Sequence, residues 1–199
     1  MRLFLAVELN DAVRRIAEAT AEALRAAIGP APNIRWVPVE NMHLTVRFIG
    51  QVDDARAPAV VAALTPPLDI APFDIELSGC GVFPPSGSPR VIWIGLTAGL
   101  PQLAAMHDEF DRRLAPFGFE PERRPFSAHL TLARIKDPST ANPRAPGAVR
   151  TTVRQAIRDV APEPTRGHIT RATVFQSHLS PRGPRYEPLA FAPLRAVPA

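Results

Sequence analysis

Apolar residues follow two different periods along this chain, and each period predicts a different element. Residues 2–9 are almost continuously apolar, which indicates a first strand. Apolar residues then recur at helical spacing from Val13 to Ile28. Asn10 precedes this stretch and Gly29 follows it, as expected for residues that cap the two ends of a helix. The chain is therefore predicted to open with a strand followed by a long amphipathic helix.

The apolar pattern of the remaining chain predicts strands and helices in an order that occurs twice. The first half has expected strands at 33–37, 42–49, 73–78 and 90–96 and a weaker helix at 53–64. The second half has an expected helix at 101–117, a strand at 127–135, a helix at 148–160 and strands near 168–177 and 185–194. Proline-rich loops are expected at 84–89 and 137–147. Each half passes from a helix into a strand, as two related lobes would.

One strand of each half contains the same pattern, His-Leu-Thr followed by an aliphatic residue. The first copy is HLTV at 43–46 and the second is HLTL at 129–132. The copies lie too far apart for a solenoid repeat, but their separation suits two lobes that bring their motifs to a shared cleft. We therefore predict one domain over residues 1–199, made of two intertwined lobes that each carry one motif.

Strand alternation predicts which side chains share a face with the first histidine. In a regular strand, Thr45 and Arg47 lie on the face of His43. Phe48 lies on the opposite face, with the apolar residues that enter the core. Arg47 is therefore a candidate to pair with an anion bound beside His43.

The second copy presents the same pair of functional groups. Thr131 shares the face of His129, whereas Arg134 falls on the apolar face of a regular strand. Arg134 would reach the face of His129 only through a bulge or at the end of the strand. With that condition, Arg134 is the second candidate for an anion contact.

Two imidazoles and two hydroxyls at one cleft suit phosphodiester chemistry. Imidazole titrates near neutral pH, so one histidine can act as a general base and the other as a general acid. Threonine hydroxyls can donate hydrogen bonds to phosphate oxygens. A single His-x-Thr is usually a half-buried histidine satisfied by a neighbour, but two copies favour catalysis. Neither copy has the spacing of a metal site, so we expect no metal and no cofactor.

Composition adds the expected partner and compartment. The 199 residues are 46% hydrophobic, as in an ordinary folded protein. The net charge of +4 is compatible with an anionic partner. The single cysteine, Cys80, excludes an intrachain disulfide and favours a reducing compartment. The first apolar run is interrupted at Glu8, too early for a signal peptide or a membrane span. We expect a cytoplasmic protein that does not enter a membrane.

Several other residues are weaker candidates. Phe48 and Phe126 flank the motifs and are candidates to stack a base, although a phenylalanine that alternates with apolar residues is more often part of the core. The histidines without a repeated partner, His107, His168 and His178, are interpreted as structural or solvated.

The two HxTx motifs, HLTV at 43–46 and HLTL at 129–132, resemble those of the 2H phosphoesterase superfamily. The chain is most similar to the RNA 2′,3′-cyclic phosphodiesterases, once named 2′-5′ RNA ligases. The segments that carry this resemblance are RLFLAVEL, NMHLTVRFIG, GCGVFP, RVIWIGL, FSAHLTLARI and VFQSHLSPRGPRYEPL. The resemblance implies an α+β fold with two pseudo-symmetric antiparallel sheets, flanked by helices, and a central cleft.

The resemblance also implies a reaction and a role for each motif residue. His43 would protonate the leaving ribose oxygen, His129 would activate water, and Thr45 and Thr131 would hold the phosphate. Ser177, in the late family-like segment, would be a cleft residue. The reaction would be metal-independent hydrolysis of RNA ends with a 2′,3′-cyclic phosphate to a 2′-phosphate.

The residues alone leave several points open. They do not decide which histidine is the acid. Two other functions remain: a ligase that joins or cleaves 2′-5′ linkages in tRNA halves, and a non-catalytic protein that binds RNA ends. We expect a monomer whose partner is RNA or an oligonucleotide.

Overall fold

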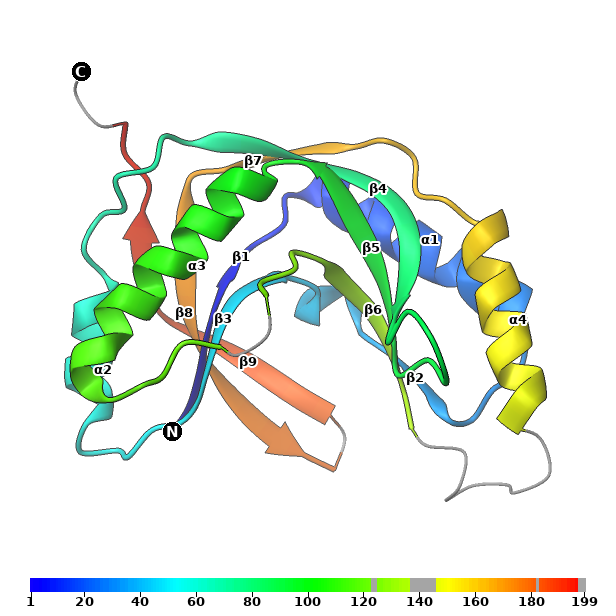
Figure 1. Cartoon of the computed structure of the whole chain (residues 1–199), viewed down its shortest axis with the longest axis horizontal. Helices are drawn as coiled ribbons and strands as arrows, with labels where there is room; N and C mark the ends of the chain where they lie inside the picture. The colour runs from blue at the N-terminus through cyan, green and yellow to red at the C-terminus, as the bar shows by residue number, and fades with distance from the viewer. Residues whose placement is uncertain (123–124, 137–145, 182, 197–199) are drawn as a thin grey trace.

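The computed structural model describes residues 1–122, 125–136, 146–181 and 183–196, and these form an α+β fold around one antiparallel sheet. Its strands are β1 (Arg2–Val7), β2 (Ile34–Trp36), β3 (Leu44–Gln51), β4 (Phe73–Phe83), β5 (Val91–Ala98), β6 (Leu130–Ile135), β7 (Arg166–Ile169), β8 (Arg171–Ser180) and β9 (Gly183–Pro193). The order across the sheet is β7-β4-β5-β6-β3-β1-β8-β9, and β2 pairs with β6 outside this path. Figure 1 shows that the sheet is strongly curved.

The strand order is symmetric about its centre. The two motif strands, β3 and β6, are the central pair, and β1 and β5 flank them. Leu44 on β3 pairs with Leu130 on β6 and joins the two halves. The predicted α+β fold is confirmed. The two expected sheets are continuous across this central pair, because the motif strands are hydrogen-bonded neighbours.

Four helices cover the sheet: α1 (Asp11–Ile28), α2 (Ala57–Leu64), α3 (Leu100–Leu114) and α4 (Pro146–Asp159). In Figure 1, α2 and α3 lie at one end of the molecule and α1 and α4 at the other. Helix α1 comes from the first half but contacts β6 and β7, while α3 comes from the second half and contacts β3. Each half of the chain therefore supplies a helix to the sheet of the other half.

The predicted start and end of α1 are confirmed by its caps. The side chain of Asn10 accepts a hydrogen bond from the backbone N–H of Val13 at 2.9 Å. Gly29 has a φ of 74°, a conformation that glycine adopts without the steric cost of a Cβ. These local signals are strong, so the helix ends where its sequence indicates.

Strand β4 continues past the predicted end at residue 78. Gly79 has a φ of 59° and interrupts the pairing register with β5. This irregularity lets the strand continue to Phe83, one residue before the expected loop. The second proline-rich loop was expected at 137–147, and residues 137–145 of it lie outside the described residues.

The apolar core lies between the helices and one face of the sheet. Leu44 and Leu130 are almost completely buried there, together with Met106 and Phe110 of α3. None of the helices in the described ranges has both the length and the apolar character of a membrane span. Because alternate strand residues point to opposite faces, the motif histidines lie on the face away from this core.

Candidate active site

The two motifs lie side by side at the centre of the sheet. We call their four functional side chains the motif quartet: His43, Thr45, His129 and Thr131. Leu44 and Leu130 are direct antiparallel partners, so each histidine lies opposite the threonine of the other copy. The two leucines point into the core, and the quartet is half-buried on the opposite face, which we call the site face. The predicted shared location of the motifs is thus a pair of adjacent strands.

Both imidazoles are held by the same local hydrogen bond. His43 Nδ1 lies 2.8 Å from the carbonyl oxygen of Asn41, and His129 Nδ1 lies 2.7 Å from that of Ser127. A carbonyl oxygen can only accept, so Nδ1 of each ring carries the proton that is donated. Each Nε2 is therefore without a proton when the ring is neutral, and it can accept one.

The two threonines of the quartet keep their hydroxyls available. No hydrogen bond joins Thr45 Oγ1 or Thr131 Oγ1 to another of the described residues. Both side chains are half-buried beside an imidazole. They can therefore donate to a bound anion without first breaking a hydrogen bond to those residues.

A β-bulge follows the threonine in both copies and changes the predicted faces. Val46 in β3 and Leu132 in β6 each lie opposite no residue of the flanking strand. Alternation then resumes one residue out of phase. Arg47 consequently turns toward the core, whereas Phe48 and Arg134 emerge on the site face. The condition stated for Arg134, a bulge, is met.

The expectation that Arg47 shares the face of the first histidine is wrong. Its side chain is only 5% exposed and forms an ion pair with Asp111 of α3. Its Nη1 donates to the carbonyl oxygen of Phe48 at 2.6 Å and lies 3.2 Å from a carboxylate oxygen of Glu122. Its Nη2 donates to the carbonyl oxygen of Glu120 at 2.5 Å. The guanidinium is therefore committed to protein groups, and we withdraw Arg47 as a phosphate contact.

Phe126 also lies away from the site face. Its ring stacks on His107 of α3, with centroids 4.7 Å apart and planes 19° apart. His107 is buried, and its Nδ1 lies 2.8 Å from the carbonyl oxygen of Val46. This hydrogen bond satisfies a carbonyl of the bulged strand. We withdraw Phe126 as a base contact, and His107 has the structural role that was predicted.

Aromatic rings surround the two histidines. Three rings line His43, with centroid distances of 4.9 Å to Phe4, 5.2 Å to Tyr186 and 6.3 Å to Phe175. They come from β1, β9 and β8, strands of the same half of the sheet. Phe4 and Phe175 belong to a small apolar cluster that is separate from the main core. These rings exclude water from the imidazole of His43.

Aromatic side chains from the other half of the sheet line His129 in the same way. Its ring lies 5.0 Å from Phe83 and 6.4 Å from Trp93, measured between centroids. The indole of Trp93 covers Gly81, where a Cβ would lie only 2.2 Å from the ring. Gly81, the second glycine of the GCGVFP segment, is thus needed at this position because a side chain would displace Trp93.

Burial lowers the pKa of both histidines. The pKa of His43 falls from 6.5 to about 4, chiefly because the ring is desolvated, with smaller effects from the charges of Arg134 and His129. The pKa of His129 is also lowered, again mainly by desolvation and then by Arg134. Arg134 therefore places a positive charge near both imidazoles, while its side chain remains exposed. The same positive charge would attract a phosphate bound between the histidines.

Strand pairing places Ser177 opposite one of the aromatic residues that line His43. It is half-buried on β8 and pairs across the hairpin with Tyr186, the ring in edge contact with His43. Tyr186 itself was not a candidate, although it lies in the family-like segment that contains Ser177.

The remaining candidate groups have other environments. His168 lies 2.7 Å from Asp74, and His178 lies 3.1 Å from Glu187, both on exposed or half-exposed surfaces. Burial raises the pKa of the Cys80 thiol to about 11, which makes it a poor nucleophile. Among the described residues, no three His, Cys, Asp or Glu side chains form a group that could hold a metal ion.

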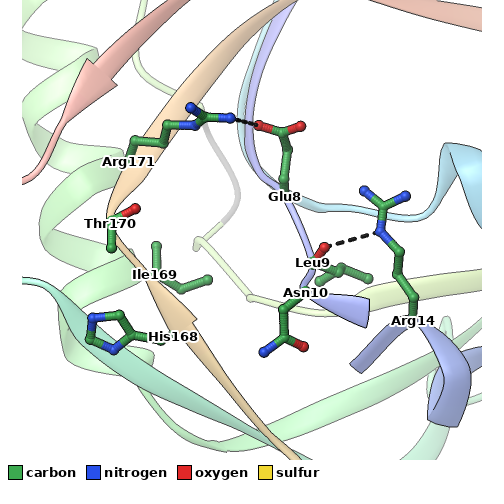
Figure 2. Close-up of a pocket in the computed structure, with 8 residues that line it drawn as sticks. All are labelled: Glu8, Leu9, Asn10, Arg14, His168, Ile169, Thr170 and Arg171. Carbon is green, nitrogen blue, oxygen red and sulfur yellow. Dashed lines mark hydrogen bonds and ion pairs between the residues drawn. The ribbon is translucent and has the colours of Figure 1, made fainter. Parts of the chain in front are cut away.

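A pocket of about 290 Å³ lies apart from the motif quartet, where β1 leads into α1 (Figure 2). It is lined by Glu8, Leu9, Asn10, Arg14, His168, Ile169, Thr170 and Arg171. Arg171 pairs with Glu8, and Arg14 Nε donates to the carbonyl oxygen of Leu9 (Figure 2). None of the predicted catalytic or phosphate-binding residues lines this pocket.

Comparisons with known proteins detect the same duplication. The model of the family described as LigT like Phosphoesterase matches residues 7–93 and again residues 94–186, one motif in each match. A relative from Aeropyrum pernix, named RNA 2′,3′-cyclic phosphodiesterase, is 42% identical over 103 residues, which is 52% of this chain and 58% of the relative. A relative of the same name from Archaeoglobus fulgidus is 31% identical over 95% of this chain and 98% of its own length.

A solved structure supports the same assignment. The crystal structure of the Thermus thermophilus protein TT0787 matches with a TM-score of 0.71 and 27% identity, covering 98% of this chain and 99% of that one. The resemblance predicted from the two HxTx motifs is confirmed. Both halves of the chain match the family model, and the chain belongs to the LigT-like phosphoesterase family.

Proposed function

We propose that this protein hydrolyses RNA ends that carry a 2′,3′-cyclic phosphate and leaves a 2′-phosphate, without a metal ion. The observation that carries the proposal is the matched geometry of the two imidazoles. Each is oriented by a backbone carbonyl through Nδ1, and each lies beside a threonine hydroxyl with no hydrogen-bond partner among the described residues. The names of the relatives from A. pernix and A. fulgidus support the same substrate.

The reaction requires one proton to be taken and one to be given. Nε2 of the neutral imidazole accepts a proton from water as the water oxygen attacks phosphorus. The bond between phosphorus and the ribose 3′ oxygen breaks, and the protonated imidazole gives its Nε2 proton to that oxygen. The 2′ ester bond remains, so the product is a 2′-phosphate. The two threonine hydroxyls and Arg134 stabilise the negative charge on the non-bridging oxygens.

Burial makes both histidines of the quartet neutral near pH 7 in the free enzyme. His43 has the pKa of about 4 and is neutral over most of the pH range in the free enzyme. The pKa of His129 is lowered as well, so either free ring can accept a proton. We therefore propose His43 and His129 as the acid–base pair, and a substrate with a good leaving group assigns the two roles.

The direct test is hydrolysis of a defined RNA end. Purified protein is incubated with EDTA and an oligonucleotide ending in a 2′,3′-cyclic phosphate, with and without a second oligonucleotide bearing a 5′-hydroxyl. We expect turnover to a 2′-phosphate at a rate that EDTA does not change. A 3′-phosphate product would overturn the regiochemistry. A joined product as the main outcome would favour the ligase, and binding without turnover would favour an RNA-end-binding protein.

The threonines of the quartet should contribute to transition-state binding. We expect Thr45→Val and Thr131→Val each to lower kcat/KM by about 1–3 kcal/mol, roughly 5- to 150-fold, because a phosphate oxygen loses a donor while the side-chain shape is kept. Thr65→Val is a matched control, since Thr65 lies at the end of α2 and bonds only to a local carbonyl. Unchanged kinetics in both quartet variants would remove the hydroxyls from the mechanism.

The lowered histidine pKa values predict an acidic pH optimum for kcat/KM. The acid must be protonated, and its proton is lost as pH rises through a pKa that lies below 6.5 in the free enzyme. The other ring must be neutral, and both rings become protonated as pH falls toward about 4, the pKa of His43. The profile should therefore be a bell with its maximum between these limits. Because the two imidazoles interact, the apparent pKa values of the two limbs of this profile belong to the pair and not to either histidine alone.

Arg134→Gln provides a test of the cause of this profile. Removing the positive charge should move both limbs of the kcat/KM profile to higher pH, because Arg134 lowers the pKa of both histidines. Bound substrate, which is anionic, should move the kcat profile upward in the same direction. Limbs that stay in place in the Arg134 variant would show that other groups titrate in the reaction.

A further inference from the structure

Two arginines lie directly opposite each other where β2 pairs with β6. Arg35 of β2 is the antiparallel partner of Arg134, the residue that emerges on the site face after the bulge of the second motif. A backbone hydrogen bond from the N–H of Lys136 to the carbonyl oxygen of Asn33, at 2.9 Å, fixes this register two residues further along. Directly opposed residues of an antiparallel pair present their side chains on the same face. Both guanidinium groups therefore belong to the site face.

Alternation along β2 agrees with this placement. Ile34 is buried and Trp36 packs against the main core, whereas Arg35 between them is exposed. The side chain of Arg35 thus has no part in the packing of the core.

The two opposed charges have no carboxylate partner within the described ranges. Neither Arg35 nor Arg134 forms an ion pair or a side-chain hydrogen bond with any residue there. The neighbour of Arg134 on its other side is Val91 of β5, which is uncharged. Like charges directly opposite each other in a sheet reduce stability. A pair that costs stability and has no protein counterion indicates a binding place for an anion from outside the chain.

The arginine pair leads away from the motif quartet along β6. Strand β2 borders the same edge of β6 as β3 does, because β3 pairs at Leu130 and β2 pairs from Ala133 to Ile135 (Figure 1). Arg134 is the nearer of the two arginines, since its charge reaches both imidazoles. Arg35 lies one strand beyond it, at the Cα separation of about 5.5 Å that is typical of hydrogen-bonded antiparallel partners. The site face therefore presents the quartet, then Arg134, then Arg35.

An RNA end with a cyclic phosphate has a second anion close to the first. The 5′ oxygen of the terminal ribose carries the phosphodiester that links it to the preceding nucleotide. The two phosphates are thus attached to one sugar. A cyclic mononucleotide with a free 5′-hydroxyl lacks the second anion. The planar fork of an arginine can donate two hydrogen bonds to such a phosphate.

We propose that Arg35 binds the phosphodiester on the 5′ side of the terminal nucleotide, while the quartet and Arg134 bind the cyclic phosphate. The inference rests on the proposed function, and it identifies the preferred substrate as an RNA or oligonucleotide end rather than a cyclic mononucleotide. The contact carries no base preference, because a phosphate contact positions a strand without reading its sequence. Arg35 binds substrate and takes no part in the proton transfers.

The first test compares ligands with and without the second phosphate. Binding of adenosine 2′,5′-bisphosphate and of 2′-AMP is measured by titration calorimetry at low salt. We expect the wild type to bind the bisphosphate about 3- to 10-fold more tightly, the scale of one charge-assisted contact at an exposed site. Arg35→Gln should remove most of this ratio. Arg35→Lys should retain part of it, because the charge remains but the fork is lost.

Arg15→Gln is the matched control for these titrations. Arg15 is exposed and forms no ion pair with the described residues, and it lies on α1, on the core side of the sheet. The substitution changes the net charge by the same amount, so it should preserve the ratio between the two ligands. An equal loss of the ratio in Arg15→Gln and Arg35→Gln would reduce the effect to net charge and overturn the contact.

Kinetics test the same contact in the reaction. The measured quantity is kcat/KM for the dinucleotide ApA ending in a 2′,3′-cyclic phosphate, divided by kcat/KM for 2′,3′-cyclic AMP. Arg35→Gln should lower this quotient about 3- to 10-fold, mainly through KM. A methylphosphonate linkage removes the charge but keeps the preceding nucleoside. It should lower the wild-type quotient by the same factor and have no further effect in Arg35→Gln, as expected for two halves of one interaction.

Stability and salt dependence separate this contact from a structural role. Arg35→Gln should unfold thermally at the wild-type temperature or above it, because the substitution relieves a like-charge pair. The slope of log KM for the dinucleotide against log salt should fall by about 0.7, the contribution of one phosphate of a single strand. A destabilised variant with unchanged ligand ratios would make Arg35 structural and overturn the proposal.

The contact and the proposed reaction fail in different ways. If the wild type hydrolyses both substrates and Arg35→Gln changes neither the bisphosphate ratio nor the kinetic quotient, the contact is wrong and the enzyme remains. If the bisphosphate ratio depends on Arg35 but no cyclic phosphate is turned over, the contact stands and the reaction is wrong. A ratio that depends on Arg35 for the bisphosphate but not for the dinucleotide would overturn the assignment to the phosphodiester.

Discussion

Replacing either His43 or His129 with alanine is expected to reduce kcat for a cyclic phosphate end by at least about 100-fold. Loss of a general acid or base usually costs 10²- to 10⁴-fold, and the two imidazoles perform different steps of the same reaction. Both side chains lie on the site face, away from the main core, so the fold should be retained. The measurement is steady-state hydrolysis, with circular dichroism of each variant. A near wild-type kcat in either variant would contradict paired-histidine catalysis.

A substrate with a good leaving group can separate the two roles. A p-nitrophenyl phosphodiester needs no proton on its leaving oxygen, so it should tolerate loss of the acid but not of the base. If His43 is the base, His129→Ala keeps much of its activity on this ester and His43→Ala does not. The opposite result would support the assignment implied by the resemblance, with His43 as the acid. His168→Ala, at an exposed histidine paired with Asp74, is the matched control.

The repeated motif made the location of the candidate site predictable from the sequence. Because a residue pattern repeated in two strands is an internal comparison, it singled out His43, Thr45, His129 and Thr131 as candidates without any alignment. Local capping signals likewise predicted α1 to within a residue at each end. What the repeat did not show is that its strands are direct neighbours, because pairing between β3 and β6 depends on the whole sheet.

The faces of Arg47 and Phe48 were predicted incorrectly because alternation assumes a regular strand. A bulge depends on the register of the flanking strand and on partners from elsewhere in the fold. His107 is such a partner, because its Nδ1 donates a hydrogen bond to the carbonyl oxygen of Val46. The second copy did contain a signal. Leu132 and Ala133 are consecutive apolar residues before the exposed Arg134, which indicates a change of phase.

The aromatic walls around the histidines could not be found from sequence position. Phe4, Phe83, Trp93 and Tyr186 come from four separate strands and meet only in the folded sheet. Their effect is nevertheless central, because desolvation is the largest cause of the lowered pKa of both histidines. The motif supplies the proposed reacting groups, and side chains of the surrounding strands lower the pKa of the two histidines.

Arg47→Met is expected to destabilise the protein by about 3–5 kcal/mol, the usual cost of removing one partner of a buried ion pair. The change leaves Asp111, whose side chain is 14% exposed, without its cation, and it leaves the Glu120 and Phe48 carbonyls without their donor. The measurement is urea unfolding at pH 7. Arg112→Met is the matched control: Arg112 also pairs with a carboxylate of α3, but its side chain is 75% exposed, so its loss should cost at most about 1 kcal/mol.

The same pair of variants distinguishes a buried clamp from a phosphate ligand. If Arg47 bound the phosphate, the Arg47→Met variant would bind substrate more weakly but keep its stability. The contacts of Arg47 instead predict a large loss of stability. Replacing Asp111 with leucine in the Arg47→Met background should recover part of that loss, because the uncompensated carboxylate is then removed. Equal stability of Arg47→Met and Arg112→Met would show that the network is not needed for folding.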